Sequence, residues 1–564
     1  MSFNQYRTNP GQAVSNFKGR TDTPKAWPGF AVSKWMNGGL FGDAPIGDSW
    51  IIHSRQIQPN VANRFYNVGI SADKYLVGSQ VYGPNSKQAV AWFEIDSAGT
   101  LNAVSPVIYT TTSGTFGYPL NGMYTYYQAI VDSSGNWIVQ FQSEQDAPGY
   151  GQATNLVSLN SNLGENYNRV WVSNGNSYIC RPSGTTLSSS GKVALSTTFR
   201  SSNNTANFAY NILQYPAAQS ATPGQTKTWD MQLYANNYLT APYYNFAEGR
   251  GIFGSSANDV IFSVGQKGGD PSFAFERTTI ATKTNSSGGK DYAKYYRRMQ
   301  PSGGTPSASA YPSGGCCDSS DNVYINGYSN DVNGTNSNPI YHLKINSSGV
   351  GQYIREVRNN PTFSGSGFDT TDIGDIKADG SKYVSMGSGL IASGDAQRGA
   401  VVFIRNSSGV ITSAYSIKCA NAAGTLIRVD GETSKISGND LVLTLSVHGP
   451  QNNACLLRLK DGLDGTFTGT SKIELTDSAG NNPYDATFTI ASFTAFVEIN
   501  YPPGAPNYQL AEWDTGSGGI TVAGSNVGGR SYSGTGNITP GSSGTASQAY
   551  TDSQTNVWQV KGIS

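Results

Sequence analysis

The sequence is poor in charge, cysteine and long apolar runs, and each shortage excludes a class of protein. Only 13% of its 564 residues are charged, and Lys plus Arg equals Asp plus Glu at 37 each. No net charge is therefore available to attract nucleic acid or a charged membrane. Five cysteines, an odd number that includes the adjacent Cys316 and Cys317, do not make a disulfide framework. No apolar run approaches the roughly 18 residues of a membrane-spanning helix, so we expect no membrane insertion.

The motifs of common catalytic and metal sites are also missing. The chain has no Gly-x-Ser-x-Gly elbow, no Walker loop, no Cys-x-x-Cys pair and no His-x-x-x-His pair. Its three histidines, His53, His342 and His448, stand in separate strand-like segments, which favours structural roles. Residues 132–136 and 318–322 resemble calcium loops but lack the glutamate at the end of such a loop, so we interpret them as turns. We predict no catalytic residue, metal ion or cofactor.

Turn and strand residues, by contrast, are abundant, with 67 Gly, 25 Pro and 33 Tyr. A turn of Asp, Ser, Gly or Asn followed by a short aromatic or β-branched strand recurs seven times. The first strand residues are Tyr75, Trp137, Val193, Val260, Val323, Tyr383 and Leu441. The spacings between them are 62, 56, 67, 63, 60 and 58 residues. A repeat of this length indicates one supersecondary unit that recurs in space.

A second strand in most repeats alternates apolar and polar residues and ends in an Asx and Gly turn, as in residues 92–99 and 342–349. No amphipathic helical stretch is present, which favours an all-β fold. Four short antiparallel strands take roughly 40–50 residues, so this period leaves room for one longer loop per unit. We therefore predict a seven-bladed β-propeller. Its third and fourth repeats are irregular, and three alternatives remain for residues 165–300: one blade, two blades or an insertion.

The predicted propeller spans residues 50–480 and lies between two regions of different composition. Residues 50–57 are strand-like and are either a strand that closes the ring or a simple lead-in strand. Residues 1–49 form an extended N-terminal arm. Residues 481–564 form a mildly acidic C-terminal β extension rich in Gly, Ser and Thr. Because neither end resembles an independently stable segment, we expect partners to hold both of them.

The N-terminal arm combines aromatic and basic side chains. Up to Phe41 it has five basic residues against Asp22 alone. Because its Pro and Gly residues prevent a regular element, the arm cannot form a core of its own, and its apolar side chains need another surface to cover them. The arm either packs along its own propeller or docks on a neighbouring subunit or another protein, and we adopt the second interpretation. The residues predicted to make that contact are Phe3, Tyr6, Arg7, Phe17, Lys18, Arg20, Trp27, Phe30 and Trp35.

The densest basic-aromatic stretch is Tyr-Ala-Lys-Tyr-Tyr-Arg-Arg-Met at residues 292–299. One interpretation is a surface that meets acidic partners or glycans through stacking and cation–π contacts. The other, which we favour, is a solvated strand edge or loop of the fourth blade.

Two segments of the fifth repeat carry a resemblance to a known family: Asp-Ser-Ser-Asp-Asn-Val-Tyr-Ile-Asn-Gly-Tyr at 318–328 and Ile-Asn-Ser-Ser-Gly at 345–349. They resemble the bacterial and phage β-propeller repeat, roughly D-x-x-G-N-V-Y-V-T-G-x-T and then L-x-K-L-D-x-x-G. Propeller chains with Gly/Ser-rich ends are similar to virion proteins of tailed bacteriophages, where they serve as tail, nozzle, fibre or adaptor components. The resemblance assigns no individual residue.

What the resemblance implies is a structural, tail-associated virion protein, made in the host cytoplasm. Its partners would be other virion structural proteins and further copies of itself in a symmetric assembly, with no nucleic acid. The alternative is a host-attachment module that binds a surface glycan. A third alternative is a secreted carbohydrate-active enzyme, because glycoside hydrolysis needs only two carboxylates and no motif can exclude it.

Overall fold

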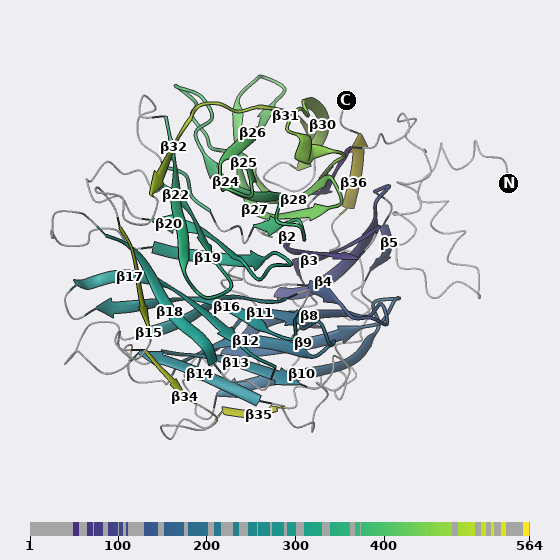
Figure 1. Cartoon of the computed structure of the whole chain (residues 1–564). Helices are drawn as coiled ribbons and strands as arrows, with labels where there is room; N and C mark the ends of the chain where they lie inside the picture. The colour runs from purple at the N-terminus through teal and green to yellow at the C-terminus, as the bar shows by residue number, and fades with distance from the viewer. Residues whose placement is uncertain are drawn as a thin grey trace, which may run out of the picture.

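The structure, a computed structural model of the chain, is built almost entirely of β-strands (Figure 1). Among the residues it describes, the one helix is η3 (Gly462–Asp464), and no helix is long and apolar enough to cross a membrane. The described residues are 49–55, 65–71, 73–82, 88–99, 101–104, 109–110, 129–144, 152–173, 179–200, 208–215, 229–235, 246–255, 258–270, 273–286, 290–299, 310–329, 339–360, 367–370, 372, 374–449, 452–476, 483–501, 509–514, 520–523, 532–536 and 557–562. The prediction of an all-β chain is confirmed.

The strands form antiparallel groups of four, which we number as units 1 to 7. Unit 1 comprises β2 (Phe65–Ser71), β3 (Lys74–Tyr82), β4 (Gln88–Asp96) and β5 (Leu101–Val104), with β6 (Tyr109–Thr110) beside β4. Unit 2 comprises β7 (Ala129–Val131), β8 (Trp137–Glu144), β9 (Gln152–Leu159) and β10 (Glu165–Ser173). Unit 3 comprises β11 (Ile179–Leu187), β12 (Val193–Arg200), β13 (Phe208–Tyr215) and β14 (Trp229–Ala235). Unit 4 comprises β15 (Phe246–Gly254), β16 (Ile261–Asp270), β17 (Phe273–Thr284) and β18 (Lys290–Met299).

The remaining units follow the same plan. Unit 5 comprises β19 (Ala310–Cys317), β20 (Val323–Ser329), β21 (Ile340–Ile345) and β22 (Gly351–Asn359). Unit 6 comprises β23 (Asp375–Ile376), β24 (Lys382–Gly389), β25 (Gly399–Asn406) and β26 (Ile411–Asn421). Unit 7 comprises β27 (Leu426–Ser437), β28 (Asp440–His448), β29 (Asn452–Leu459) and, from the other end of the chain, β1 (Trp50–Arg55). Each predicted turn-plus-strand segment leads into the second strand of a unit, and residues 165–300 contain two whole units.

An aspartate or asparagine builds many of the tight turns between these strands. Oδ1 of Asp132, Asp318 and Asn346 accepts hydrogen bonds from the backbone N–H groups two and four residues further on, at 2.8 to 3.1 Å. The residue three positions on takes a left-handed conformation, as at Gly135 (φ 79°) and Gly349 (φ 77°), which glycine adopts at little cost. Backbone N–H groups thus engage both aspartates of the segments that resemble calcium loops, which confirms that those segments are turns.

The innermost strands contact one another in a circuit. β2, β7, β11, β15, β19, β23 and β27 each contact the next strand of this series, and β27 contacts β2. At the join, β1 pairs with β29, with Trp50 opposite Arg458. The indole Nε1 of Trp50 and Nη1 of Arg458 both donate to the carbonyl of Ser97 in unit 1, at 3.0 and 2.7 Å. The N-terminal strand therefore completes unit 7 and ties it to unit 1.

The strands that follow residue 480 add to the outside of the units, in reverse chain order. β31 (Pro483–Ser492) pairs with β26, β32 (Phe496–Tyr501) with β22, β33 (Gln509–Asp514) with β18, β34 (Ile520–Ala523) with β14, β35 (Tyr532–Gly536) with β10, and β36 (Val557–Gly562) with β1. β30 (Gly469–Thr476) pairs with β31. We name β31–β36 the C-terminal strand series, and Figure 1 shows it along the rim. The sequence suggested that partners hold this region, whereas its described strands pair with their own chain.

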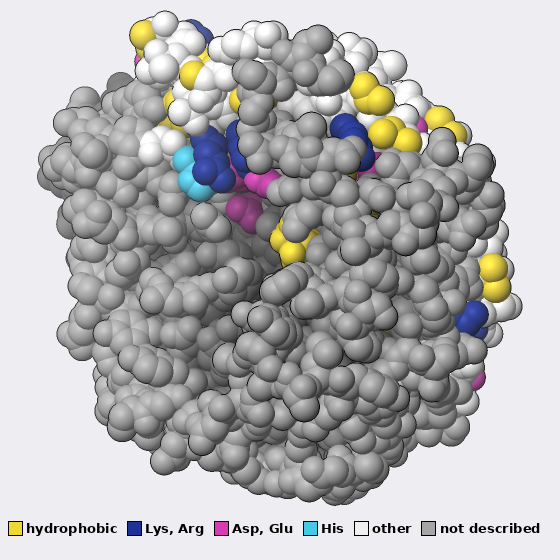
Figure 2. All heavy atoms as spheres, turned by 90° about the vertical axis from the view of Figure 1, so that its left-hand side faces the viewer, with side chains coloured by type: hydrophobic (Ala, Val, Ile, Leu, Met, Phe, Trp, Pro, Cys, Tyr) yellow, Lys and Arg dark blue, Asp and Glu magenta, His cyan; other side chains and the backbone are white. Residues whose placement is uncertain are grey.

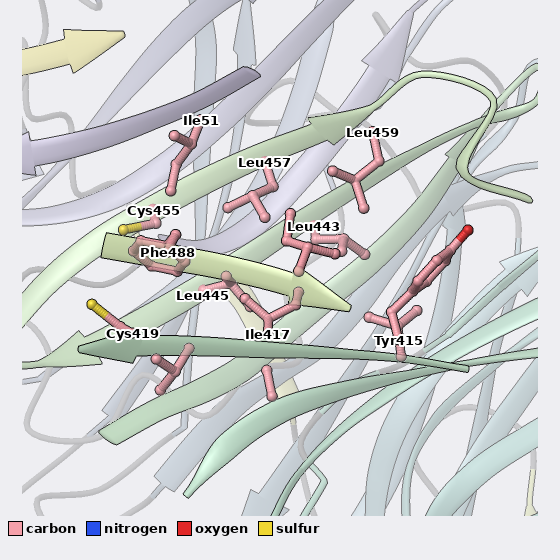
Figure 3. Close-up of a cluster of buried hydrophobic side chains, with 14 of the residues drawn as sticks. Ile51, Tyr415, Ile417, Cys419, Leu443, Leu445, Cys455, Leu457, Leu459 and Phe488 are labelled. Carbon is pink, nitrogen blue, oxygen red and sulfur yellow. The ribbon is translucent and has the colours of Figure 1, made fainter. Parts of the chain in front are cut away.

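Hydrophobic cores lie between neighbouring units. In the largest, between units 6 and 7, Ile417 and Cys419 from β26 meet Leu443 and Leu445 from β28, and Phe488 of β31 covers them (Figure 3). The cluster is completely or almost completely buried. The first strand of the C-terminal strand series is therefore part of the core, and removing it would expose apolar surface.

Buried polar side chains also join the units. The amide of Gln140 in unit 2 donates to the carbonyl of Ser196 in unit 3 at 3.2 Å and accepts from the N–H of Gly184 at 2.9 Å. Asp372, at the start of unit 6, accepts hydrogen bonds from the hydroxyl and the backbone N–H of Ser434 in unit 7, at 2.5 and 2.8 Å. Because such groups are satisfied only in one arrangement, they fix how each unit sits against the next.

Candidate functional site

The predicted contact residues of the N-terminal arm lie outside the described residues. They are Phe3, Tyr6, Arg7, Phe17, Lys18, Arg20, Trp27, Phe30 and Trp35. Their docking on a partner stays a prediction.

The basic-aromatic stretch lies in β18 and is neither a solvated edge nor a loop. Tyr292 and Tyr296 are buried, and the hydroxyl of Tyr296 donates to the carbonyl of Gly349 in unit 5 at 2.8 Å. At its outer edge β18 pairs with β33, and the register places Lys294 opposite Asp514. The acidic segment opposite this basic strand is thus part of the same chain.

A second acidic residue of the C-terminal strand series holds a buried cation. Arg405 of β25 is fully buried, donates to the carbonyl of Gly409 at 2.8 Å and forms an ion pair with Glu498 of β32. Nη1 of Arg355 in β22 lies 3.8 Å from the same carboxylate. Because an unpaired buried charge is strongly destabilising, Glu498 stabilises a guanidinium that units 5 and 6 enclose.

The three histidines are distributed over β1, β21 and β28 and do not form one site. His53 and His342 are fully buried, whereas His448 lies at the end of β28. The ring of His342 lies 4.3 Å from that of Tyr383. Burial and then the nearby Arg405 hold the pKa of His342 well below its usual value, so it packs as a neutral ring. In the described part of the chain, no group of three or more His, Cys, Asp and Glu could hold a metal ion.

Charged side chains gather where units 6 and 7 meet, near the start of β27. The other end of β27 leads into a tight turn at residues 437–440. We name these charged side chains the loop-face cluster: Asp369, Arg398, Arg428, Asp430, Glu432 and His448. Figure 2 shows basic, acidic and histidine side chains beside one another on this side of the molecule. Only His448 was singled out from the sequence. The others belong to no motif, and only the packing of two units brings them together.

Ion pairs hold the loop-face cluster together. Nη2 of Arg428 lies 2.7 Å from Oδ2 of Asp430, and Nε2 of His448 lies 2.8 Å from the same oxygen. Arg398 pairs with Asp369. The side chain of Arg428 is 45% exposed, so its guanidinium remains accessible to a polar ligand while it is paired.

The electrostatics of this region do not favour acid catalysis. Burial alone would raise the pKa of Asp430, but hydrogen bonds from His448 and Arg428 outweigh it and lower that pKa to about 2. Burial raises the pKa of Asp372 to about 6, yet that side chain is fully buried and engaged by backbone N–H groups and a hydroxyl. A general acid needs both a raised pKa and access to substrate. Neither aspartate combines the two.

Comparisons with known proteins find similarity in structure alone. No protein-family model and no curated protein sequence matches the chain. The polysaccharide lyase Uly1 is 11% identical, with a TM-score of 0.40 over 70% of this chain and 90% of that one. An apocarotenoid oxygenase of Synechocystis is 8% identical, with a TM-score of 0.32 over 84% and 98%. A xylan beta-1,4-xylosidase of Bacillus halodurans C-125 is 9% identical, with a TM-score of 0.28 over 77% and 99%. These solved structures belong to enzymes, but likenesses this distant carry no argument about the activity of this chain.

Proposed function

We propose that units 1 to 7 are the blades of a closed, seven-bladed β-propeller. The circuit of contacts between innermost strands supports this, because it returns from β27 to β2. The pairing of β1 with β29 supports it as well, since propellers are closed when a strand from one terminus completes the blade built by the other.

We propose further that this propeller is a rigid structural component of a bacteriophage virion, associated with the tail. The observation that carries the proposal is the C-terminal strand series, which covers the outer edge of six of the seven units. Uncovered strand edges invite nonspecific association. A block with covered edges joins an assembly through other features, and the aromatic, basic N-terminal arm supplies that attachment to neighbouring virion proteins and to further copies of the chain.

Deletion of residues 2–41 tests this function. The shortened protein should fold, as judged by circular dichroism and gel filtration, but should be absent from purified particles by mass spectrometry. The double variant Trp27→Ala, Phe30→Ala should also be incorporated into particles less than the unaltered protein. Lys472→Ala, at an exposed position of β30, is the matched surface control and should incorporate normally. Normal incorporation of the protein without its arm would contradict the proposal.

A second candidate is recognition of a host-surface glycan by the loop-face cluster. The exposed guanidinium of Arg428 beside a carboxylate and an imidazole favours it, because planar polar groups of this kind bind sugar hydroxyls. Arg428→Ala should then weaken binding of the protein to host cells, whereas Lys472→Ala should not. Equal binding by both variants would exclude this face as the receptor site.

A further inference from the structure

A central cavity of about 220 Å³ lies where the innermost strands of all seven units converge. Its wall consists of Val68, Ala129, Ile130, Thr186, Phe253, Gly254, Gly315, Cys316, Cys317, Asp375, Ile376 and Lys435. These residues come from β2, β7, β11, β15, β19, β23 and β27. The cavity is therefore a property of the whole ring, and no single repeat of the sequence encodes it.

The cavity opens at the end of the ring where the tight turns lie. Asp375, Ile376 and Lys435 are half-buried and precede the turns at residues 377–381 and 438–439, whereas Val68 and Phe253 are buried. The cavity and the loop-face cluster lie at opposite ends of β27. Arg428 of the cluster is near the start of that strand, and Lys435 of the cavity is near its end. The two sites are separate.

Most of the wall is apolar or small. Phe253 supplies an aromatic ring, and Cys316 and Cys317 supply thiols whose pKa values burial raises, so that both are neutral and act as small apolar groups. Cavities that bind small molecules have this composition: an apolar lining with a few polar groups that fix the orientation of the ligand.

Two charged groups stand in this apolar wall. Oδ2 of Asp375 accepts a hydrogen bond from the backbone N–H of Ile436 at 2.8 Å. Lys435 lines the same cavity, and no side-chain hydrogen bond or ion pair joins its ammonium group to a residue that the structure describes. Lys435 and Asp375 thus bring opposite charges to one cavity without pairing directly. Each can therefore engage a ligand group: the ammonium an anion, and the carboxylate a hydroxyl.

We propose that the central cavity binds a small hydroxylated carboxylate, such as a single sugar acid. The carboxylate of the ligand pairs with Lys435, and a ligand hydroxyl donates to Asp375. The size of the cavity, below the roughly 300–1,000 Å³ of sites for larger ligands, selects one sugar unit over an oligosaccharide. This binding site is independent of the proposed role in the virion.

Isothermal titration calorimetry of the full-length protein with glucuronate tests the proposal, with glucose as the matched neutral probe. Glucuronate should bind and glucose should not. Lys435→Met should weaken glucuronate binding by about tenfold or more, Lys435→Arg should retain part of it, and Lys472→Met should leave it unchanged. Asp375→Asn should weaken it less than Lys435→Met. Circular dichroism of each variant shows whether it is folded.

Three results would overturn the proposal: no binding of glucuronate to the unaltered protein, equal binding of glucose, or equal affinity of glucuronate for the folded Lys435→Met variant. None of them depends on particle assembly, so failure here and failure of the virion proposal are distinguishable.

Discussion

Two aspartates at the junction of units 6 and 7 carry opposite pKa shifts because their neighbours differ. Asp372 is fully buried and receives hydrogen bonds from neutral donors only, so burial dominates and raises its pKa to about 6. Asp430 is also largely enclosed, but hydrogen bonds from His448 and Arg428 outweigh burial and lower its pKa to about 2. The surroundings therefore decide the sign of each shift.

The first prediction concerns the pH dependence that Asp372 confers. Between about pH 4 and pH 6 the folded protein retains a proton on Asp372 that the unfolded chain has lost. The stabilising contribution is therefore greatest below pH 4 and declines as the pH rises to 6, by about 3 kcal/mol for a shift of this size. Denaturant unfolding of the unaltered protein and of Asp372→Asn measures it. The advantage of the unaltered protein should shrink as the pH rises through this window.

Asp430 serves as the internal control, because its pKa shift has the opposite sign to that of Asp372. Its lowered pKa stabilises the folded protein above pH 4, and this contribution should vanish as the pH falls towards 2. Asp430→Asn should therefore lose stability relative to the unaltered protein at pH 5 and regain it near pH 2. A difference between Asp372→Asn and the unaltered protein that stays constant from pH 4 to pH 6 would rule out the account of Asp372.

At the scale of single elements, β32 is held to units 5 and 6 by Glu498. Replacing this residue by Gln should leave the guanidinium of Arg405 buried without a counter-charge, which costs roughly 3–5 kcal/mol. The midpoint of urea unfolding measures the loss. The matched control is Asp464→Asn, an exposed acid outside any strand, which should change little. Equal effects of the two substitutions would show that Glu498 is not an anchor.

The C-terminal strand series as a whole makes the next prediction. A chain that ends after residue 480 should expose the outer edges of six units and the apolar surface under Phe488. Uncovered edges pair with other chains, so gel filtration with light scattering should show self-association, and the thermal midpoint should fall. A chain that ends after Gly536 loses only β36 and should be affected much less. If the chain that ends after residue 480 has the thermal midpoint and the association state of the full-length protein, this role of the series is contradicted.

Sequence reasoning succeeded where structure depends on neighbours in the chain. The turn at Asp318, for example, is set by its own backbone N–H groups, so its position and the strand that follows were predictable. The pairing of β33 with β18 joins residues far apart in the sequence, and the six residues of β33 have no pattern that reveals which strand they will join. Lys435 and Asp375 carried no signal either, because their shared cavity exists only once all the innermost strands have converged.

At the scale of the whole molecule, the C-terminal region supports the N-terminal strand of unit 7. The C-terminal strand series runs back along the units and finishes on β1, so the N-terminal strand of unit 7 lies between β29 and β36. β1 is therefore paired along both of its edges. The units are thus stabilised by the C-terminal strands of the same chain, and attachment to partners through the arm before residue 50 stays a proposal.

The most direct test of this account is mass spectrometry and cryo-electron microscopy of bacteriophage particles purified from cells that produce this chain. The account predicts a closed ring of seven blades in the tail, with an additional outer strand on the blades that the C-terminal strand series covers, attached to its neighbours through the N-terminal arm. A ring with another number of blades, an unpaired C-terminal region, or particles without this protein would contradict it.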